Sequence, residues 1–184
     1  SLKNVEHSKI KRVLKEYAFQ VKKNKLKILR ENSKDIKKAQ RKKLIDRLIL
    51  NSAKINQIIS SVKAIEKFKN PIGQVLSKWK RSNKLQIEKV SIPIGVICVI
   101  YESRPNVTAD VAALCLKSGN SVILRGGSEA YYTNRFLAKL FRKALKKNKI
   151  DENCVQFIEK RDRKIVDFLL SKMNNYIDLV VPRG

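Results

Sequence analysis

A long apolar run, Ile92–Tyr101, interrupts a chain that is otherwise crowded with lysine. Residues 1–90 contain 26 Lys and Arg against 7 Asp and Glu, whereas the run contains no charged residue. A continuous series of Ile and Val of this kind is typical of a strand buried on both faces of a parallel sheet. Because helices cover both faces of such a sheet, the run restricts the fold to the α/β class.

Strand-like and helix-like segments alternate from this run to the end of the chain. Thr108 is the expected N-cap of the first helix, and Gly119 with Asn120 is its expected left-handed end. The expected order is strand 92–101, helix from 108, strand 121–124, helix 129–147, strand 154–158, helix 162–171 and edge strand 177–181. This alternation predicts a doubly wound, Rossmann-like sheet with right-handed crossovers.

The N-terminal region has the pattern of two amphipathic helices, at 9–40 and 43–68. Asn70-Pro71-Ile72-Gly73 ends the second helix, Trp79 and its basic neighbours indicate a loop, and 85–90 alternates as a strand. We therefore expect an N-terminal helical region, residues 1–83, packed on an α/β domain that occupies residues 84–184.

Polar residues follow two of the expected strands, at 102–106 and 125–129. Ligands bind beyond the carboxyl ends of the strands in a doubly wound sheet, so these loops form the candidate site. Gly126 and Gly127 would admit a ligand to the backbone, the next helix would offer unpaired amide donors, and Arg125 suits a phosphate. A plain turn beside a solvated arginine is an equally good interpretation of the dipeptide alone. Neither a G-x-G-x-x-G fingerprint nor a Walker A motif is present.

The three cysteines, Cys98, Cys115 and Cys154, fall among apolar neighbours in expected strands or helices. This setting predicts buried, unreactive thiols. Unpaired cysteines without a secretory signal favour the cytoplasm, and no apolar stretch is long enough to span a bilayer. No metal site is expected, since the single His7 lies in a polar setting near the terminus.

Several blocks of this sequence resemble the gamma-glutamyl phosphate reductases, also called glutamate-5-semialdehyde dehydrogenases, of the aldehyde dehydrogenase superfamily. The blocks that carry the resemblance are Pro93–Ile97, Val99–Thr108, Cys115–Asn120 and Ile123–Glu129. Shorter matches follow the same order at Leu44–Leu48, Asn70–Val75 and Ile177–Gly184. The resemblance covers nearly the whole chain and is weakest before about residue 35.

The resemblance implies an aldehyde dehydrogenase-like fold and the second step of proline biosynthesis. Family members use NADPH to reduce L-glutamate 5-phosphate to the 5-semialdehyde, releasing phosphate, through a cysteine thiohemiacetal and thioester. By similarity, Asn106 stabilises an oxyanion, while Glu102 and Arg104 line the substrate mouth, with Arg104 facing the substrate phosphate or carboxylate. The residues that would face the NADP ribose and phosphate are Arg125, Gly126, Gly127, Ser128 and Glu129.

The length of the chain departs from the family. Members are more than twice as long, and their nucleophilic cysteine lies downstream of the block that ends in Pro182-Arg183-Gly184. We therefore expect a partial NADP-binding domain, truncated before the catalytic domain, that is inactive alone. A truncated gene, one half of a split enzyme completed by a second polypeptide, and an excised fragment are all compatible with the sequence. A non-catalytic remnant or partner subunit, and a homo-oligomer, are further alternatives.

The charge of +26, with a pI near 10.2, supports a rival interpretation as a nucleic-acid-binding protein. Such a charge attracts polyanions nonspecifically at low salt. Lys outnumbers Arg 30 to 12, aromatic residues are few, and no helix-turn-helix, zinc-finger or RNA-recognition signature appears. Nonspecific polyanion binding is therefore expected more than a dedicated nucleic-acid site, and genome composition accounts for much of the lysine.

Overall fold

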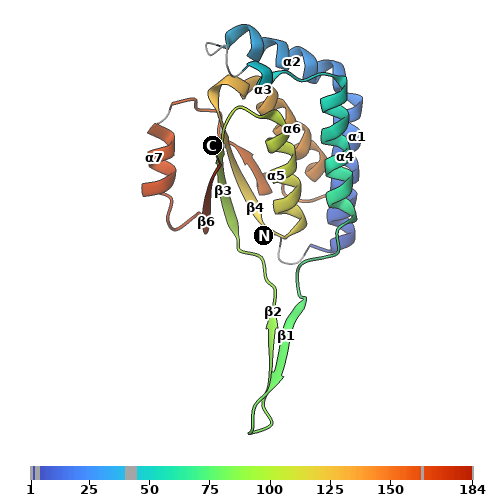
Figure 1. Ribbon diagram of the computed structural model, residues 1–184, viewed down its shortest axis with the longest axis vertical. Helices are drawn as coiled ribbons and strands as arrows, with labels where there is room; N and C mark the ends of the chain where they lie inside the picture. The colour runs from blue at the N-terminus through green and yellow to red at the C-terminus, as the bar shows by residue number, and fades with distance from the viewer. Residues whose placement is uncertain (1, 3–4, 40–44, 163, 184) are drawn as a thin grey trace.

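A four-stranded parallel sheet with helices on both faces forms the centre of the described structure (Figure 1). The computed structural model describes residues 2, 5–39, 45–162 and 164–183. Its strands are β3 (Val96–Tyr101), β4 (Ser121–Gly126), β5 (Val155–Phe157) and β6 (Leu179–Arg183), in the order β5-β4-β3-β6. Every neighbouring pair is parallel, which confirms the α/β class and the strand order along the chain. Gln40, Lys43, Leu44 and Gly184, which the expectations included, lie outside the described residues.

The helices that connect the strands lie on opposite faces of the sheet (Figure 1). On one face are α5 (Pro105–Lys117) and, after the short η2 (Ser128–Ala130), α6 (Tyr131–Lys147); on the other is α7 (Lys164–Ser171). Alternate residues of β3 divide accordingly: Ile97 and Val99 join the main core, whereas Cys98 packs with Leu169 in a smaller one. The short η3 (Glu152–Cys154) leads into β5. The doubly wound arrangement is therefore confirmed.

The sheet has a topological switch point between β3 and β6. From β3 the chain proceeds to β4 and β5 on one side, and it then returns past β3 to add β6 on the other side. The chain leaves β3 toward β4 through α5 on one face of the sheet and reaches β6 through α7 on the other face, and a crevice lies at the carboxyl ends of β3 and β6. Among the described strands β6 pairs with β3 alone, as expected for an edge.

Four helices, rather than the two expected, precede residue 70 within the described residues. They are α1 (His7–Lys23), α2 (Lys25–Lys38), α3 (Ile45–Leu48) and α4 (Ser52–Lys67). A single helix over 9–40 is wrong because α1 ends at Asn24, whose backbone N–H and side-chain Nδ2 both donate to the Gln20 carbonyl oxygen, at 3.0 and 2.8 Å. The helix expected at 43–68 is divided because Asn51 caps α4, its Oδ1 accepting from the Lys54 N–H at 2.8 Å.

The N-terminal helices form a third layer on the outer side of α5 and α6. Helix α1 packs against α4 and α6, α2 packs against α6, and α4 packs against α5. Their apolar faces join those of the sheet in one core, in which the rings of Tyr17 and Phe141 lie 4.4 Å apart. The expected boundary between residues 83 and 84 falls within the turn of a hairpin, after these helices have ended.

Buried Asp35 of α2 caps the first turn of α6. Its Oδ1 accepts from the Tyr132 N–H at 2.9 Å, and its Oδ2 accepts from the Thr133 N–H at 2.8 Å and the Thr133 hydroxyl at 2.6 Å. Burial raises the pKa of the Asp35 carboxyl above its ordinary value, against the opposing effect of these hydrogen bonds. The carboxylate satisfies helix amides that would otherwise be orphaned, over a separation of nearly 100 residues along the chain.

Asn32, one turn before Asp35, joins the same cluster to the start of α4. Its Nδ2 donates to the Leu48 carbonyl oxygen at 2.9 Å and to the Thr133 hydroxyl at 3.2 Å, while its Oδ1 accepts from the Leu50 N–H at 2.8 Å. The side chain is 1% exposed, so water does not compete for these groups. Asn32 and Asp35 together fix α2, α6 and the α3–α4 connection to one another.

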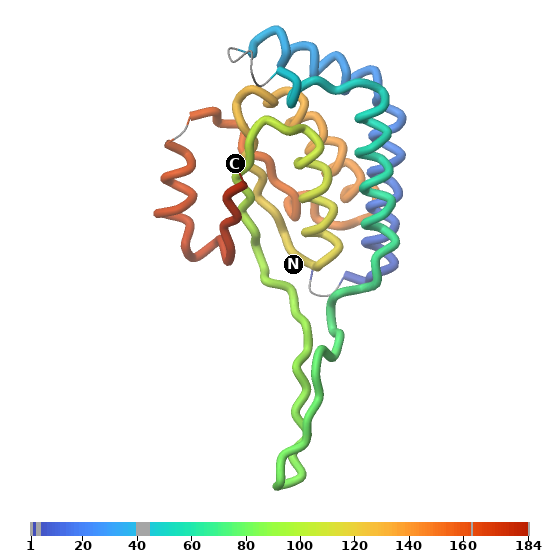
Figure 2. Tube along the Cα trace, in the orientation of Figure 1, coloured from blue at the N-terminus to red at the C-terminus, as the bar shows by residue number. Residues whose placement is uncertain are grey.

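Residues 75–90 form an antiparallel hairpin that projects from the rest of the structure (Figure 2). Its strands are β1 (Val75–Lys80) and β2 (Gln86–Val90). The loop expected around Trp79 is wrong, since Trp79 lies in β1 opposite Ile87; the strand expected at 85–90 is confirmed. Every residue of β1 is exposed to solvent, so the alternation of apolar and polar residues that marks a half-buried strand does not develop in it.

Helix α5 begins three residues earlier than the predicted cap. Pro105 occupies its first turn and Arg104 is the N-cap, with the extended backbone that a residue before proline adopts. Thr108 lies inside the helix, and its hydroxyl hydrogen-bonds the Tyr101 hydroxyl at 2.7 Å in the core. The expected end is confirmed, since Gly119 has a φ of +72°.

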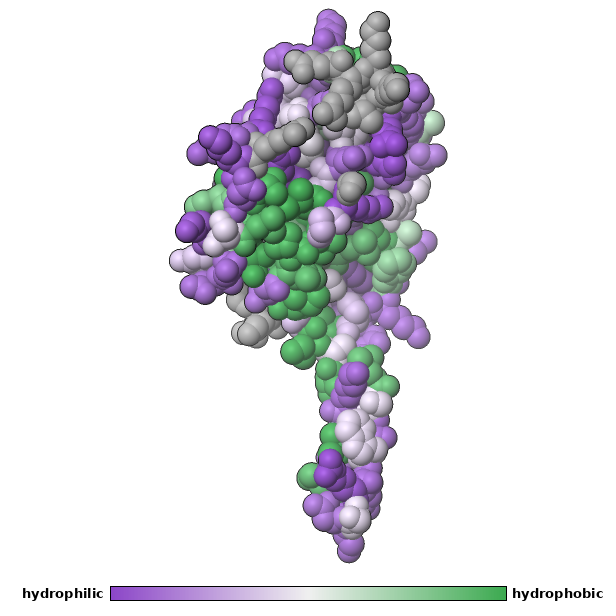
Figure 3. Space-filling view, turned by 60° about the vertical axis from the view of Figure 1, so that its left-hand side comes forward, coloured by the Kyte–Doolittle hydropathy of each residue, from purple (hydrophilic) through white to green (hydrophobic). Residues whose placement is uncertain are grey.

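Apolar side chains gather on the side of the molecule that carries α7 and β6 (Figure 3). On α7, Phe168 and Leu170 are about half exposed, and on the edge strand Leu179 and Val181 are each more than one third exposed. The main core lies on the opposite face of the sheet, beneath the other helices. The face bearing α7 is thus the thinner of the two layers.

Replacing Asp35 by alanine is expected to lower the free energy of unfolding by about 2–4 kcal/mol, because two helix amides and a buried hydroxyl lose their acceptor. Chemical denaturation monitored by circular dichroism measures this loss. The matched control is Asn51→Ala, which removes an exposed cap and should cost about 1 kcal/mol. An Asp35→Ala variant no less stable than the control would contradict the assigned role.

Candidate functional site

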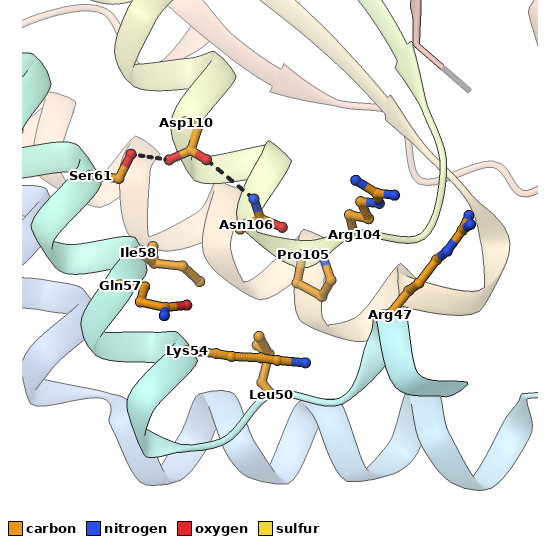
Figure 4. A pocket seen from close by; sticks show the side chains of 10 residues that line it. All are labelled: Arg47, Leu50, Lys54, Gln57, Ile58, Ser61, Arg104, Pro105, Asn106 and Asp110. Carbon is orange, nitrogen blue, oxygen red and sulfur yellow. Dashed lines mark hydrogen bonds between the residues drawn. The ribbon is translucent and has the colours of Figure 1, made fainter. Parts of the chain in front are cut away.

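A pocket of about 380 Å³ lies between α4 and the first turns of α5 (Figure 4). A second pocket, of about 210 Å³, lies at the carboxyl ends of β3 and β6, the switch point of the sheet. Arg104 lines both pockets and so connects them. The other residues of the larger pocket are Arg47, Leu50, Lys54, Gln57, Ile58, Ser61, Pro105, Asn106 and Asp110; those of the smaller are Tyr101, Glu102, Val107 and Arg183.

The segment after β3 is positioned by its backbone. The Glu102 N–H donates to the Arg183 carbonyl oxygen at 3.3 Å, which carries the pairing of β3 with β6 one residue further. The Arg104 N–H then donates to the Glu102 carbonyl oxygen at 2.8 Å, and Pro105 starts α5. This turn brings Asn106, the second residue of the helix, to the wall of the larger pocket.

A hydrogen-bond chain crosses the larger pocket from α4 to α5 (Figure 4). The Ser61 hydroxyl donates to Asp110 Oδ1 at 2.7 Å, and Asn106 Nδ2 donates to Asp110 Oδ2 at 3.3 Å. Asp110 follows Asn106 by one helical turn, which places both side chains on the same face of α5. The carboxylate therefore orients the Asn106 amide.

Three cations, Arg47, Lys54 and Arg104, line the same pocket as these hydrogen bonds. Arg47 pairs with Glu102 at 3.1 Å, and Lys54 Nζ donates to the Asp46 and Ile49 carbonyl oxygens at 3.2 and 2.7 Å. Lys54 is therefore engaged with the main chain after α3. The guanidinium of Arg104 forms no ion pair with any residue that the structure describes, and it lies exposed between the two pockets. An anionic ligand would find Arg104 free of competing carboxylates.

The loop at 125–129 lies beside the 102–106 loop, as the sequence predicted. A Cβ on Gly127 would lie 2.7 Å from Ser103 Oγ, and Ser103 Oγ donates to Glu129 Oε2 at 3.3 Å. A Cβ on Gly126 would lie 2.5 Å from Asn134 Nδ2. The space that these two glycines leave is thus filled by the protein's own side chains.

Arg125 is 8% exposed, and its guanidinium donates to the Gly126 and Arg161 carbonyl oxygens, the latter at 3.2 Å. The expectation that the next helix offers unpaired amide donors is wrong for Tyr132 and Thr133 of α6, because Asp35 accepts from both N–H groups. The carboxylate of Asp35 occupies the position that an anionic ligand would take at this helix end.

Similarity to known proteins agrees with this geometry. The gamma-glutamyl phosphate reductase of a Nitratiruptor species is 45% identical over an alignment that covers 100% of this chain and 45% of that protein. The crystal structure of the gamma-glutamyl phosphate reductase of Thermotoga maritima matches with a TM-score of 0.93 at 38% identity, covering 100% of this chain and 45% of that one. The chain belongs to the gamma-glutamyl phosphate reductase family.

The wider fold of this reductase family is that of the aldehyde dehydrogenases, as the resemblance implied. A propionaldehyde dehydrogenase from Clostridium phytofermentans is 15% identical, with a TM-score of 0.69 over 98% of this chain and 38% of that one, which shows the fold alone. No protein-family model matches the chain. The chain spans a little under half the length of the reductases that it matches.

The three cysteines of this chain do not belong to the lining of either pocket. Cys98, Cys115 and Cys154 are all buried and unpaired, and none lines either pocket. Burial raises the pKa of all three thiols, that of Cys115 to about 11. A protonated, enclosed thiol is a poor nucleophile, which agrees with the unreactive role predicted for them.

Three residues that line the pockets were not predicted from the sequence: Ser61, Asp110 and Arg183. Arg183 ends a strand at the carboxyl edge, so the rule that selected Glu102 and Arg125 would also have selected it. Asp110 lies one turn after Asn106, and that spacing was a usable signal. Ser61 left no such signal, because its position depends on how α4 packs against α5.

The described residues form neither a metal site nor a membrane-spanning helix. No group of three or more His, Cys, Asp or Glu side chains that could hold a metal ion occurs within residues 5–39, 45–162 and 164–183. Among the same residues, no helix is both long enough and apolar enough to cross a bilayer.

The native chain is expected to resist thiol–disulfide exchange at pH 8, because its thiols are buried and stay protonated at that pH. Reaction with a chromogenic disulfide reagent measures this, and all three thiols should react at once in denaturant. A thiol that reacts in the native state as fast as free cysteine would contradict the burial of these side chains.

Proposed function

We propose that this chain carries the substrate- and cofactor-facing part of a gamma-glutamyl phosphate reductase. The reaction is the NADPH-dependent reduction of L-glutamate 5-phosphate to L-glutamate 5-semialdehyde with release of phosphate. The observation that carries the proposal is the placement of Arg104, Asn106 and Arg183 along two pockets that share Arg104, the smaller of which lies at the switch point of a family fold. These groups provide positive charge and an amide donor where an acyl phosphate needs both.

Asn106 is the proposed oxyanion donor. Its amide nitrogen carries two hydrogens, of which one donates to Asp110 and fixes the plane of the amide. The second hydrogen then has a fixed direction, because the hydrogen bond to Asp110 prevents the amide from rotating. An oriented donor stabilises negative charge on the acyl oxygen without reorganising as the charge develops.

Arg104 is the proposed partner of the substrate phosphate, together with Arg183, which also lines the smaller pocket. Two guanidinium groups match the charge of a phosphate and support its departure as a leaving group. Glu102 acts through Arg47 in this scheme, because their ion pair holds Arg47 at the larger pocket. The proposed substrate-binding pair, Glu102 and Arg104, thus has two different tasks.

NADP is the proposed cofactor, and the residues nearest to its expected place are Arg125–Glu129. The fit is partial: Ser128 is exposed and Glu129 half-buried, so they offer a hydroxyl and a carboxylate for ribose hydroxyls. Arg125, Gly126 and Gly127 support this loop from within, through the guanidinium–carbonyl bonds and the close packing at the glycines. When bound, the reduced nicotinamide supplies the hydride.

The covalent step of the family needs a thiolate, and none of the three buried thiols of this chain is suited to it. We therefore propose that a further segment, in the same or another polypeptide, supplies the nucleophile. The exposed apolar residues of the hairpin and of α7 and β6 favour association with such a segment or with a second copy. Unpaired thiols agree with a reducing cytoplasm, and exposed lysines with nonspecific polyanion binding at low salt.

The purified 184-residue chain is expected to show no turnover, because no activated thiolate faces the pocket. NADPH oxidation with glutamate 5-phosphate, and the reverse reaction with the semialdehyde and phosphate, are followed by absorbance. The Thermotoga maritima reductase serves as the positive control under the same conditions. Robust turnover by a clean preparation of the chain would refute the missing-nucleophile part of the proposal.

Arg125→Ala is expected to weaken NADPH binding by about tenfold, because the loop at 126–129 loses the guanidinium that holds it. Fluorescence titration of NADPH measures the Kd, and a thermal melt checks that the variant is folded. The control is Arg142→Ala, which removes an arginine that pairs with Glu152 on the outer side of α6. An unchanged Kd for Arg125→Ala would remove Arg125 from the cofactor site.

A further inference from the structure

Asp110 is a carboxylate in a pocket whose other charged lining residues are all cations. The larger pocket carries Arg47, Lys54 and Arg104, and Asp110 is its one acidic lining residue among those that the structure describes. A pocket built for anions alone has no use for a carboxylate on its wall. The mixture matches a ligand that carries both a cationic and an anionic group.

The position of Asp110 is fixed from two helices. Ser61 on α4 and Asn106 on α5 each donate one hydrogen bond, one to each carboxylate oxygen (Figure 4). Each oxygen of an ionised carboxylate accepts about two hydrogen bonds, so acceptor capacity remains on both. The donors already present are neutral, and they leave the negative charge of Asp110 uncompensated inside the pocket.

The surrounding cations do not neutralise it. Arg47 pairs with Glu102, and Lys54 donates to main-chain carbonyl oxygens. Arg104 forms no ion pair with the described residues. Asp110 thus has no salt-bridge partner in the described structure, and an incoming cation would not need to displace one.

We propose that Asp110 binds the α-ammonium group of the glutamyl substrate and makes the site specific for an amino acid. This inference rests on the proposed function, in which Asn106 binds the acyl oxygen. Four bonds of about 1.5 Å separate the acyl carbon from the α-nitrogen of a glutamyl group. Asn106 Nδ2 and Asp110 Oδ2 are 3.3 Å apart, so the amide and the carboxylate form adjoining subsites on one face of α5. One glutamyl group is long enough to reach both.

The α-carboxylate of the same substrate would face the cationic side of the pocket. Arg47 lies there; one of its nitrogens pairs with Glu102, and its guanidinium has further N–H groups that can donate to a carboxylate. With Arg104 and Arg183 facing the phosphate, each charged group of the substrate meets an opposite charge. The pocket volume of about 380 Å³ is within the range of small-molecule sites.

The test compares two stable probes that differ only in the amino group. L-2-amino-5-phosphonopentanoate carries the ammonium group, and 5-phosphonopentanoate lacks it. Isothermal titration calorimetry measures both Kd values for the 184-residue chain, for Asp110→Asn and for Asp167→Asn. The last variant is the control, because Asp167 is an exposed carboxylate on α7, outside both pockets.

The wild-type chain and the Asp167→Asn control are expected to bind the amino probe about tenfold more tightly than its partner, as one charge-assisted hydrogen bond predicts. Asp110→Asn should lose that preference while its Kd for the partner changes less than about twofold. Because the wild-type comparison needs no variant, the proposal stays testable even if Asp110→Asn fails to fold.

A wild-type chain that binds both probes equally would overturn the role of Asp110 and leave the proposed function standing. Equal weakening of both probes in Asp110→Asn would also overturn it, since Asp110 would then contribute nothing specific to the ammonium group. Failure of the wild-type chain to bind either probe would overturn this inference and the substrate part of the proposed function together.

Discussion

The capping of α6 by Asp35 is the interaction on which the rest of the structure depends. It joins the outer helical layer to the helix that follows β4, so the loop at 125–129 starts from a fixed end. Asn32 extends the same cluster to the connection before α4, which forms one wall of the larger pocket. A buried carboxylate that satisfies helix amides also excludes any other anion from that helix end. Asp35 thereby prevents a phosphate from binding at the N-terminus of α6.

The strand positions could be predicted from the sequence because buried strands of a parallel sheet need unbroken apolar runs, and few other segments have them. The end of α1 at Asn24, the start of α4 after Asn51 and the strand around Trp79 were not predicted, for a common reason. The two helix boundaries depend on local hydrogen bonds and the strand is fully exposed, and neither condition changes the spacing of apolar residues along the sequence.

The candidate site was predicted in outline and corrected in detail. Glu102, Arg104 and Asn106 follow β3, where the rule for doubly wound sheets puts ligands, and they do line pockets. That rule does not reveal which neighbouring strand completes the crevice, since strand order comes from the fold. In the order β5-β4-β3-β6, the smaller pocket lies between β3 and β6, beside Arg183, and not between β3 and β4, beside Arg125. Arg125 and the glycines line neither of the two pockets and pack within the adjoining loop.

The central claim is that a glutamyl phosphate lies across the two pockets joined by Arg104, and a crystal structure with L-2-amino-5-phosphonopentanoate tests it most directly. The account predicts the phosphonate between Arg104 and Arg183 and the ammonium group within hydrogen-bond distance of Asp110. Density for the ligand at Arg161 and Tyr131, at the other end of the carboxyl edge, with both pockets empty, would contradict it.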